Sequence, residues 1–214
     1  MKRPDMMAFY ASVKCSASEV VARILDFFTS DLKGHLMDTY ARIDFAPEEG
    51  VYHITDEVLD LRGRDDLLRR VSRDLDCRWA FYVYLVFYPA EVYCAVFRDR
   101  TPTLGSTLML KIDPKITRSF EDEEESRMPF AIFLIRIAQT VGSNWFVSGP
   151  YIDEIKPISP DQLKNPENVS GLYIIGWKAG TAEEEVILSA LKVNTQSETV
   201  KRTTLGYNVI IMYA

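Results

Sequence analysis

The tripeptide Glu154-Ile155-Lys156 has residue types that could carry catalysis. A carboxylate two residues before a lysine at a strand end is typical of restriction-type nucleases, in which paired carboxylates hold Mg²⁺ and the lysine stabilises developing negative charge. Such a site needs another aspartate on a neighbouring strand, and Asp113 is the candidate. The same spacing occurs at Asp31-Leu32-Lys33 within a predicted helix, so the pattern arises easily by chance.

The spacing of the histidine, serine and glycine residues predicts no metal site, no serine hydrolase site and no nucleotide-binding loop. The only histidines are His35 and His53, too few for a histidine-rich metal site. The segment Gly142-Ser143-Asn144-Trp145 lacks the second glycine of a nucleophile elbow. The ten glycines are scattered singly, without the spacings that hold nucleotide phosphates. We therefore expect no resident metal and no cofactor, and the sequence favours a protein that is not an enzyme.

Two acidic runs and two aromatic residues are candidates for a partner-binding surface. The runs are 121–125, before an apolar helix, and 183–185. Solvated carboxylates near helix N-termini explain both runs, and an electronegative rim that steers a basic partner is the alternative. Trp145 and Tyr151 can be core residues or interface anchors. The residues expected to contact a partner are Glu121, Glu123, Glu124, Glu125, Trp145, Tyr151, Glu183 and Glu184.

The elements that would position these residues follow from local patterns. In the first half we expect a strand at 6–14, a helix that starts with a Ser16/Glu19 capping box and ends near Gly34, and a hairpin at 40–55. A short helix at 63–71 and strands at 79–88 and 92–97 complete this half. Strand, helix, strand, strand, helix, strand is the order of a ferredoxin-like unit, which the first half could adopt.

The second half is predicted to add more sheet and two helices. We expect a strand at 107–112, an apolar helix at 129–141 with Phe133 in the core, and strands at 172–177 and 207–213 around a helix at 182–191. The segment 147–171 is rich in Pro, Ser and Asn and predicts a long surface connection.

Composition and length bound the fold class. With 214 residues, 47% hydrophobic and 26% charged, the chain can bury a full core without disulfides or a structural metal. We predict an α+β fold, a single compact domain over 1–214 with a mostly antiparallel sheet and packed helices. A subdivision near residue 100 is the alternative, with a βαββαβ-like half at 1–100 and a second α+β half at 101–214.

Charge and cysteine usage exclude several classes of partner. A net charge of -6 disfavours nucleic acid and anionic lipid, which attract basic proteins. The longest apolar run, 129–138, contains Arg136 and is too short to span a bilayer, and the N-terminus lacks the apolar region of a signal peptide. Three cysteines without close spacing indicate reduced thiols, so we expect a cytoplasmic protein.

These observations favour a non-enzymatic cytoplasmic binding protein whose partner is a basic protein, such as a bacterial immunity protein that inhibits a toxin. We expect neither nucleic acid nor membrane as a partner. One alternative is a metal-dependent nuclease-type hydrolase using Asp113, Glu154 and Lys156. The other is a structural subunit that oligomerises through exposed sheet edges.

Overall fold

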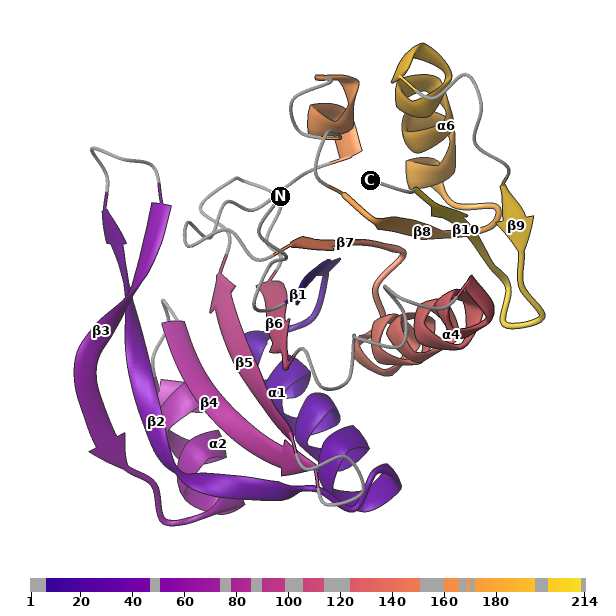
Figure 1. The fold of residues 1–214 in the computed structure, drawn as a ribbon. Coiled ribbons are helices and arrows are strands. Elements are labelled where there is room, and N and C mark those ends of the chain that lie inside the picture. Colours follow the sequence, from indigo (N-terminus) through magenta and orange to yellow (C-terminus); the bar gives the residue numbers. More distant parts are fainter. Residues whose placement is uncertain are drawn as a thin grey trace.

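The computed structural model describes residues 7–46, 51–73, 78–85, 90–98, 106–113, 124–150, 160–165, 169, 172–194 and 200–212. Within these residues, ten strands form one sheet, every strand pair is antiparallel, and four α-helices pack against it (Figure 1). The predicted α+β class with a large antiparallel sheet is confirmed. None of the helices in these ranges combines the length and apolar character needed to cross a membrane.

The sheet has the strand order β3-β2-β4-β5-β6-β1-β7-β8-β10-β9. The strands are β1 Met7–Val13, β2 His35–Ala46, β3 Val51–Asp60, β4 Arg78–Leu85, β5 Ala90–Arg98, β6 Ser106–Ile112, β7 Trp145–Pro150, β8 Ile174–Lys178, β9 Lys201–Arg202 and β10 Tyr207–Ile211. The helices are α1 Ala17–Asp26, which continues as a π-helical turn over Phe27–Asp31, α2 Arg64–Arg73, α4 Glu124–Val141 and α6 Ala182–Asn194, with a 3-10 helix at Pro160–Lys164.

The capping box predicted for the first helix is present at the start of α1. The Glu19 N–H donates to Ser16 Oγ at 3.3 Å, and the Ser16 N–H donates to Glu19 Oε2 at 2.9 Å. These two bonds satisfy backbone donors that have no partner within the helix. The apolar side of α1, including Val20 and Ile24, is fully buried, as the helical spacing predicts.

The ferredoxin-like arrangement predicted for the first half is wrong, although the order of elements along the chain is right. A ferredoxin-like unit places one strand between β1 and β2, whereas β4, β5 and β6 separate them in this sheet. The neighbours of β1 are instead β6 and β7, and Ala11 pairs with both Leu108 and Phe146. Local periodicity identifies β1 as a strand but carries no information about such distant partners.

The predicted surface connection at 147–171 also needs correction, because its first residues belong to β7. This strand pairs with β1 on one side and β8 on the other, and Ser148 is fully buried. Later in the same segment, Leu163 and Val169 are buried too. The composition of Ser148-Gly149-Pro150 suggests a turn, but Ser148 pairs with both β1 and β8, and Gly149 and Pro150 pair with β1.

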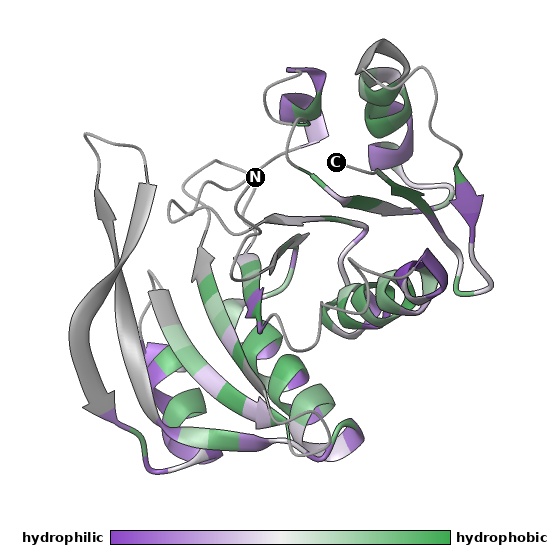
Figure 2. Cartoon of the chain, viewed as in Figure 1, coloured by the Kyte–Doolittle hydropathy of each residue, from purple (hydrophilic) through white to green (hydrophobic). Residues whose placement is uncertain are grey.

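The strands β7, β8 and β10 are covered by helices on both faces. Phe146 and Val209 share one apolar cluster with α1 and α4 residues, whereas Val147 and Ile210 share a second cluster with α6 residues. Because neighbouring residues of a strand point to opposite faces, α4 and α6 lie on opposite sides of these strands, and Figure 1 shows α6 above and α4 below them. In Figure 2, α1 and α4 are coloured largely as hydrophobic and β9 as hydrophilic.

Candidate functional site

Of the three residues predicted for a nuclease site, Asp113 is the one that lies within the described residues. Asp113 is half-buried directly after β6, while Glu154 and Lys156 lie outside those residues. Met7 of β1 pairs with both Ile112 and Pro150. The C-terminal ends of β6 and β7 therefore lie at the same end of β1, with β1 between the two strands. Asp113 therefore does not follow a strand adjacent to β7. In the part of the chain that the structure describes, no group of three or more His, Cys, Asp or Glu residues could hold a metal ion.

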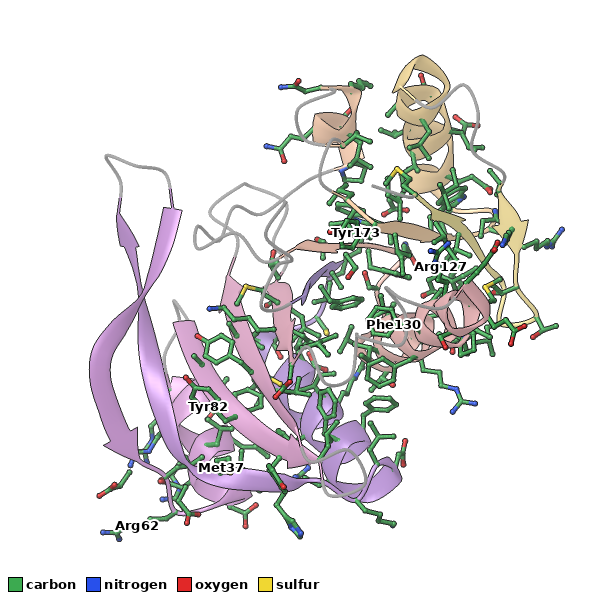
Figure 3. All side chains as sticks on the ribbon, viewed as in Figure 1. Met37, Arg62, Tyr82, Arg127, Phe130 and Tyr173 are labelled. Carbon is green, nitrogen blue, oxygen red and sulfur yellow. The ribbon has the colours of Figure 1, made fainter. Side chains whose placement is uncertain are left out.

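The first acidic run leads into α4, which begins at Glu124, five residues earlier than predicted. Glu124 and Glu125 form the first turn of α4 and are exposed, while Glu121 and Glu123 lie outside the described residues. The positive end of the helix dipole stabilises carboxylates at this position. Figure 3 labels Arg127 and Phe130, which follow this turn along α4.

In the second acidic run, Glu184 holds three elements together. Its Oε1 accepts hydrogen bonds from Trp177 Nε1 at 3.1 Å and Asn208 Nδ2 at 2.8 Å, and its Oε2 accepts one from the Gly180 N–H at 2.8 Å. The Gly180 N–H and the Trp177 indole hold the pKa of this carboxyl below its ordinary value of 4.5. The carboxylate of Glu184 thus connects β8, β10 and the start of α6, instead of forming part of an exposed rim.

Glu183 takes part in a second link at the same end of α6. Its Oε2 accepts a hydrogen bond from Asn144 Nδ2 at 3.3 Å, and its Oε1 lies 3.9 Å from Lys14 Nζ. The side chain of Lys14 is 90% exposed, so this ion pair contributes little stability. Of this acidic run, Glu185 is the residue whose side chain is exposed.

Trp145 is a core residue in this structure, which corrects its assignment as an exposed partner anchor. Its side chain is 4% exposed and packs in the apolar cluster beneath α6 together with Trp177, its cross-strand partner. Large aromatic side chains contribute most to stability when buried in this way. Tyr151 lies outside the described residues.

Glu124 and Glu183, from the two acidic runs predicted to share a surface, lie on different sides of the sheet. Glu124 is the first residue of α4 and Glu183 the second residue of α6, and these two helices cover opposite faces of β7, β8 and β10. The two residues also lie at opposite ends of α4, because Asn144, three residues beyond the end of that helix, donates to Glu183. An 18-residue helix is about 27 Å long. A single flat interface therefore cannot use both Glu124 and Glu183.

A buried polar cluster around Ser143 was not expected from the sequence. Ser143 Oγ lies 2.7 Å from the Ser12 carbonyl oxygen and 2.6 Å from that of Trp145, and the Tyr207 hydroxyl donates to the Ser143 carbonyl. Burial raises the pKa of Tyr207 above its ordinary value of 10.0. The Ser143 hydroxyl hydrogen-bonds to backbone carbonyls, so its role is structural. Together with the Tyr207 hydroxyl, it links the turn between α4 and β7 to β1 and β10.

Comparisons with known proteins do not assign this chain to a family. No protein-family model matches the sequence, and no curated protein matches it. One solved structure, described as the Trypanosoma brucei AdoMetDC-delta26 monomer, aligns with 98% of this chain at 8% sequence identity and a TM-score of 0.31. The chain spans 65% of the length of that structure. Similarity at this level says nothing about what the chain does.

Proposed function

We propose that this protein works by stoichiometric binding of a basic protein in the cytoplasm, as an inhibitor of the bacterial immunity-protein kind. The observation that carries the proposal is the exposed acidic first turn of α4, Glu124 and Glu125, on a chain with a net charge of -6. A negative surface raises the rate at which a positively charged partner arrives. Two thiols, Cys15 and Cys94, are free, which fits a reducing compartment.

Contacts within the fold limit which of the predicted partner-binding residues support this proposal. Glu183 and Glu184 already accept hydrogen bonds from other parts of the fold, and Trp145 is buried. Among the acidic residues predicted to meet a partner, the start of α4 offers side chains that are both described and exposed. The partner is therefore expected to approach the α4 side of the molecule, with the contribution of α6 limited to long-range charge.

The test uses the full chain as bait to isolate a partner and then measures association kinetics. We compare the parent with Glu125→Lys and with Glu185→Lys at low and physiological ionic strength. Both variants make the same charge change in the first turn of a helix, on opposite faces of the sheet. Screening acts over about 8–10 Å at physiological salt, so association of the parent should slow as salt rises.

Glu125→Lys should slow association severalfold, while Glu185→Lys should leave it close to the parent rate, because local charge affects encounter most strongly. Equal melting temperatures for the two variants would show that the difference lies in binding. A partner that associates equally fast at both salt concentrations and ignores both substitutions would refute the proposal.

Self-association is a second candidate function, because the sheet is open and has one long edge strand, β3. A sheet edge presents unpaired N–H and C=O groups to any chain that can form another strand. Sedimentation of the full chain over a wide concentration range distinguishes the two candidates, since only a self-associating subunit gains mass with its own concentration.

A further inference from the structure

The outer side of α4, which faces away from the sheet, carries exposed charges of both signs. This helix packs against α1, β1 and β10 through the residues that it buries, such as Leu134. A row on the opposite side, at helical spacings of four, three and four residues, consists of Glu125, Pro129, Ile132 and Arg136. Ile132 is half-buried and the other three residues are exposed. Figure 1 shows α4 at the lower right of the molecule, with no described helix or strand beneath it.

The two charged residues of this row have no ion-pair partner among the residues that the structure describes. Glu125 lies in the first turn of α4, and Arg136 follows it by eleven residues, which is about 16 Å along the helix axis. Pro129 and Ile132 lie between them. The row therefore has an acidic end, an apolar middle and a basic end, which suits an interface with an apolar centre and a charged rim.

The row is complementary to itself when a second copy of the chain is turned end to end. A two-fold axis that crosses α4 midway between Glu125 and Arg136 sets each of these residues opposite the other in the second copy. The same rotation brings Pro129 and Ile132 of both copies together, because the two residues lie equally far from that midpoint. Since the two charges are equally far apart in both copies, both ion pairs can form at once.

The opposite orientation of the two helices is unfavourable. Two α4 helices packed in parallel would set Glu125 opposite Glu125 and Arg136 opposite Arg136, and like charges in contact disfavour association. Antiparallel helices also place the positive end of one helix dipole beside the negative end of the other. The order of the charges along α4 therefore selects the antiparallel pair.

We infer that two copies of this chain form a symmetric dimer through α4, with its outer row packed antiparallel against the same row of the second copy. A single pair of helices is a small interface by comparison with the roughly 1,600 Å² typical of stable complexes, so the dimer should be weak. Dimerisation goes beyond the proposed function, because it concerns the chain alone. It also covers Glu125, so a second copy and a basic partner would compete for this surface.

Sedimentation equilibrium of the full chain over a wide concentration range measures the dimer. The parent should change from one copy to two and grow no further, because a two-fold contact is closed. Glu125→Lys and Arg136→Glu each turn both ion pairs into like-charge pairs and should raise the dissociation constant at least about tenfold. The matched control is Glu185→Lys, an exposed charge change on α6, which should leave the dissociation constant near the parent value.

Mixing the two charge variants tests the predicted pairing directly. A dimer of one Glu125→Lys chain and one Arg136→Glu chain again sets opposite charges against each other at both positions. The mixture should therefore form dimers at concentrations where each variant alone is monomeric, and the double variant Glu125→Lys/Arg136→Glu should dimerise like the parent. Unfolding of a variant cannot produce this result, because an unfolded chain would not recover association on mixing.

The apolar middle of the row has a test that leaves all charges in place. Ile132→Ser should raise the dissociation constant, because the Ile132 side chains of the two copies meet at the centre of the dimer, where burial contributes most to binding. Because Ile132 faces away from the core of its own chain, the melting temperature at concentrations where the parent is monomeric should stay close to that of the parent.

Three outcomes would overturn the dimer. The parent could stay a single copy at every concentration, the mixture of charge variants could fail to associate, or the mass could grow beyond two copies and ignore every α4 variant. The first two leave the proposed function to its own kinetic test, and the third points to the β3 edge. Arg136→Glu keeps the two tests apart, because it breaks the dimer and leaves Glu125 available to a basic partner.

Discussion

Glu184 and Glu185 are adjacent and chemically identical, yet the fold gives them different environments. Glu184 accepts hydrogen bonds from Trp177, Gly180 and Asn208, whereas Glu185 is exposed. The helix-start pattern predicts acidic residues here, and both satisfy it. Which of the two side chains accepts hydrogen bonds from the rest of the fold depends on β10 lying beside β8. The acidic run itself does not encode that pairing.

The hydrogen bonds to Glu184 predict a specific dependence of stability on pH. A carboxyl whose folded pKa is depressed contributes stability above its unfolded value of 4.5, and that stability is lost as pH falls through the folded pKa. Glu184→Gln should therefore be less stable than the parent near neutral pH, and the gap should close on acidification below about 4.5. Urea unfolding midpoints across this range provide the measurement.

Glu185→Gln is the control, because it removes the same charge from the same helical turn without touching those three donors. Its unfolding midpoint should follow that of the parent at every pH. A constant difference between Glu184→Gln and the parent from neutral to acid pH would show that the hydrogen bonds do not favour the ionised form.

At the scale of elements, the apolar run in α4 specifies a core helix but not which side of the helix faces the sheet. The run correctly predicts a core helix, but Phe133 is only partly buried at the edge of the core. Its ring centroid lies 6.3 Å from that of Phe27 and 6.2 Å from that of Phe130. The fully buried positions include Leu134, Ile135 and Ile137. When nearly every position is apolar, the sequence cannot show which side faces the sheet, because the contrast that defines an amphipathic face is weak.

Truncation of two neighbouring residues in α4 tests this placement. Leu134→Ala removes a side chain with no exposed area and should cost about 2–5 kcal/mol in the free energy of unfolding. Phe133→Ala should cost less than the roughly 3–5 kcal/mol typical of a buried phenylalanine, because solvent already reaches part of its ring. Denaturant unfolding of both variants gives the comparison, and a larger loss for Phe133→Ala would mean that α4 is rotated from the orientation described.

Most of the helices and strands predicted from the sequence are present because the signals behind them are local, although β2 and α4 each begin five residues earlier than predicted and β3 ends five residues later. The capping box at Ser16 marks the start of α1, and enrichment in aromatic and β-branched residues marks β4 and β5. The prediction missed β7 because Ser148 and Gly149 resemble turn residues when taken without their neighbours. Pairing of both residues with β1, and of Ser148 also with β8, makes them part of a strand.

At the scale of the whole molecule, β1 connects the two halves of the chain. It is the first described strand, yet it lies between β6 and β7, and all of its strand partners come after residue 100. A division near residue 100 would leave β1 in one unit and its partners in the other. The two halves also share a core, because residues of α1, before residue 100, and of α4, after it, pack in one apolar cluster.

This arrangement predicts that the chain unfolds in one cooperative transition. Two probes can follow the opposite parts of the sheet. In a Trp79→Phe variant, fluorescence reports on Trp145 and Trp177, the remaining tryptophans, which are buried on β7 and β8. In a Cys15→Ser/Cys77→Ser variant, thiol labelling reports on Cys94, which is fully buried on β5 and whose burial raises its pKa and slows its reaction in the folded state.

The urea midpoints from the two probes should coincide, because loss of either half breaks the pairing of β1 with β6 and β7 and exposes part of the shared core. Each variant needs a reference signal, and far-UV circular dichroism of the same samples corrects for any stability change caused by the substitutions. Labelling of Cys94 at a lower urea concentration than the fluorescence change would show that the chain divides near residue 100. In that case, the chain would consist of two units that unfold separately. The pairing of β1 with β6 and β7 would then be too weak to couple the unfolding of the two units.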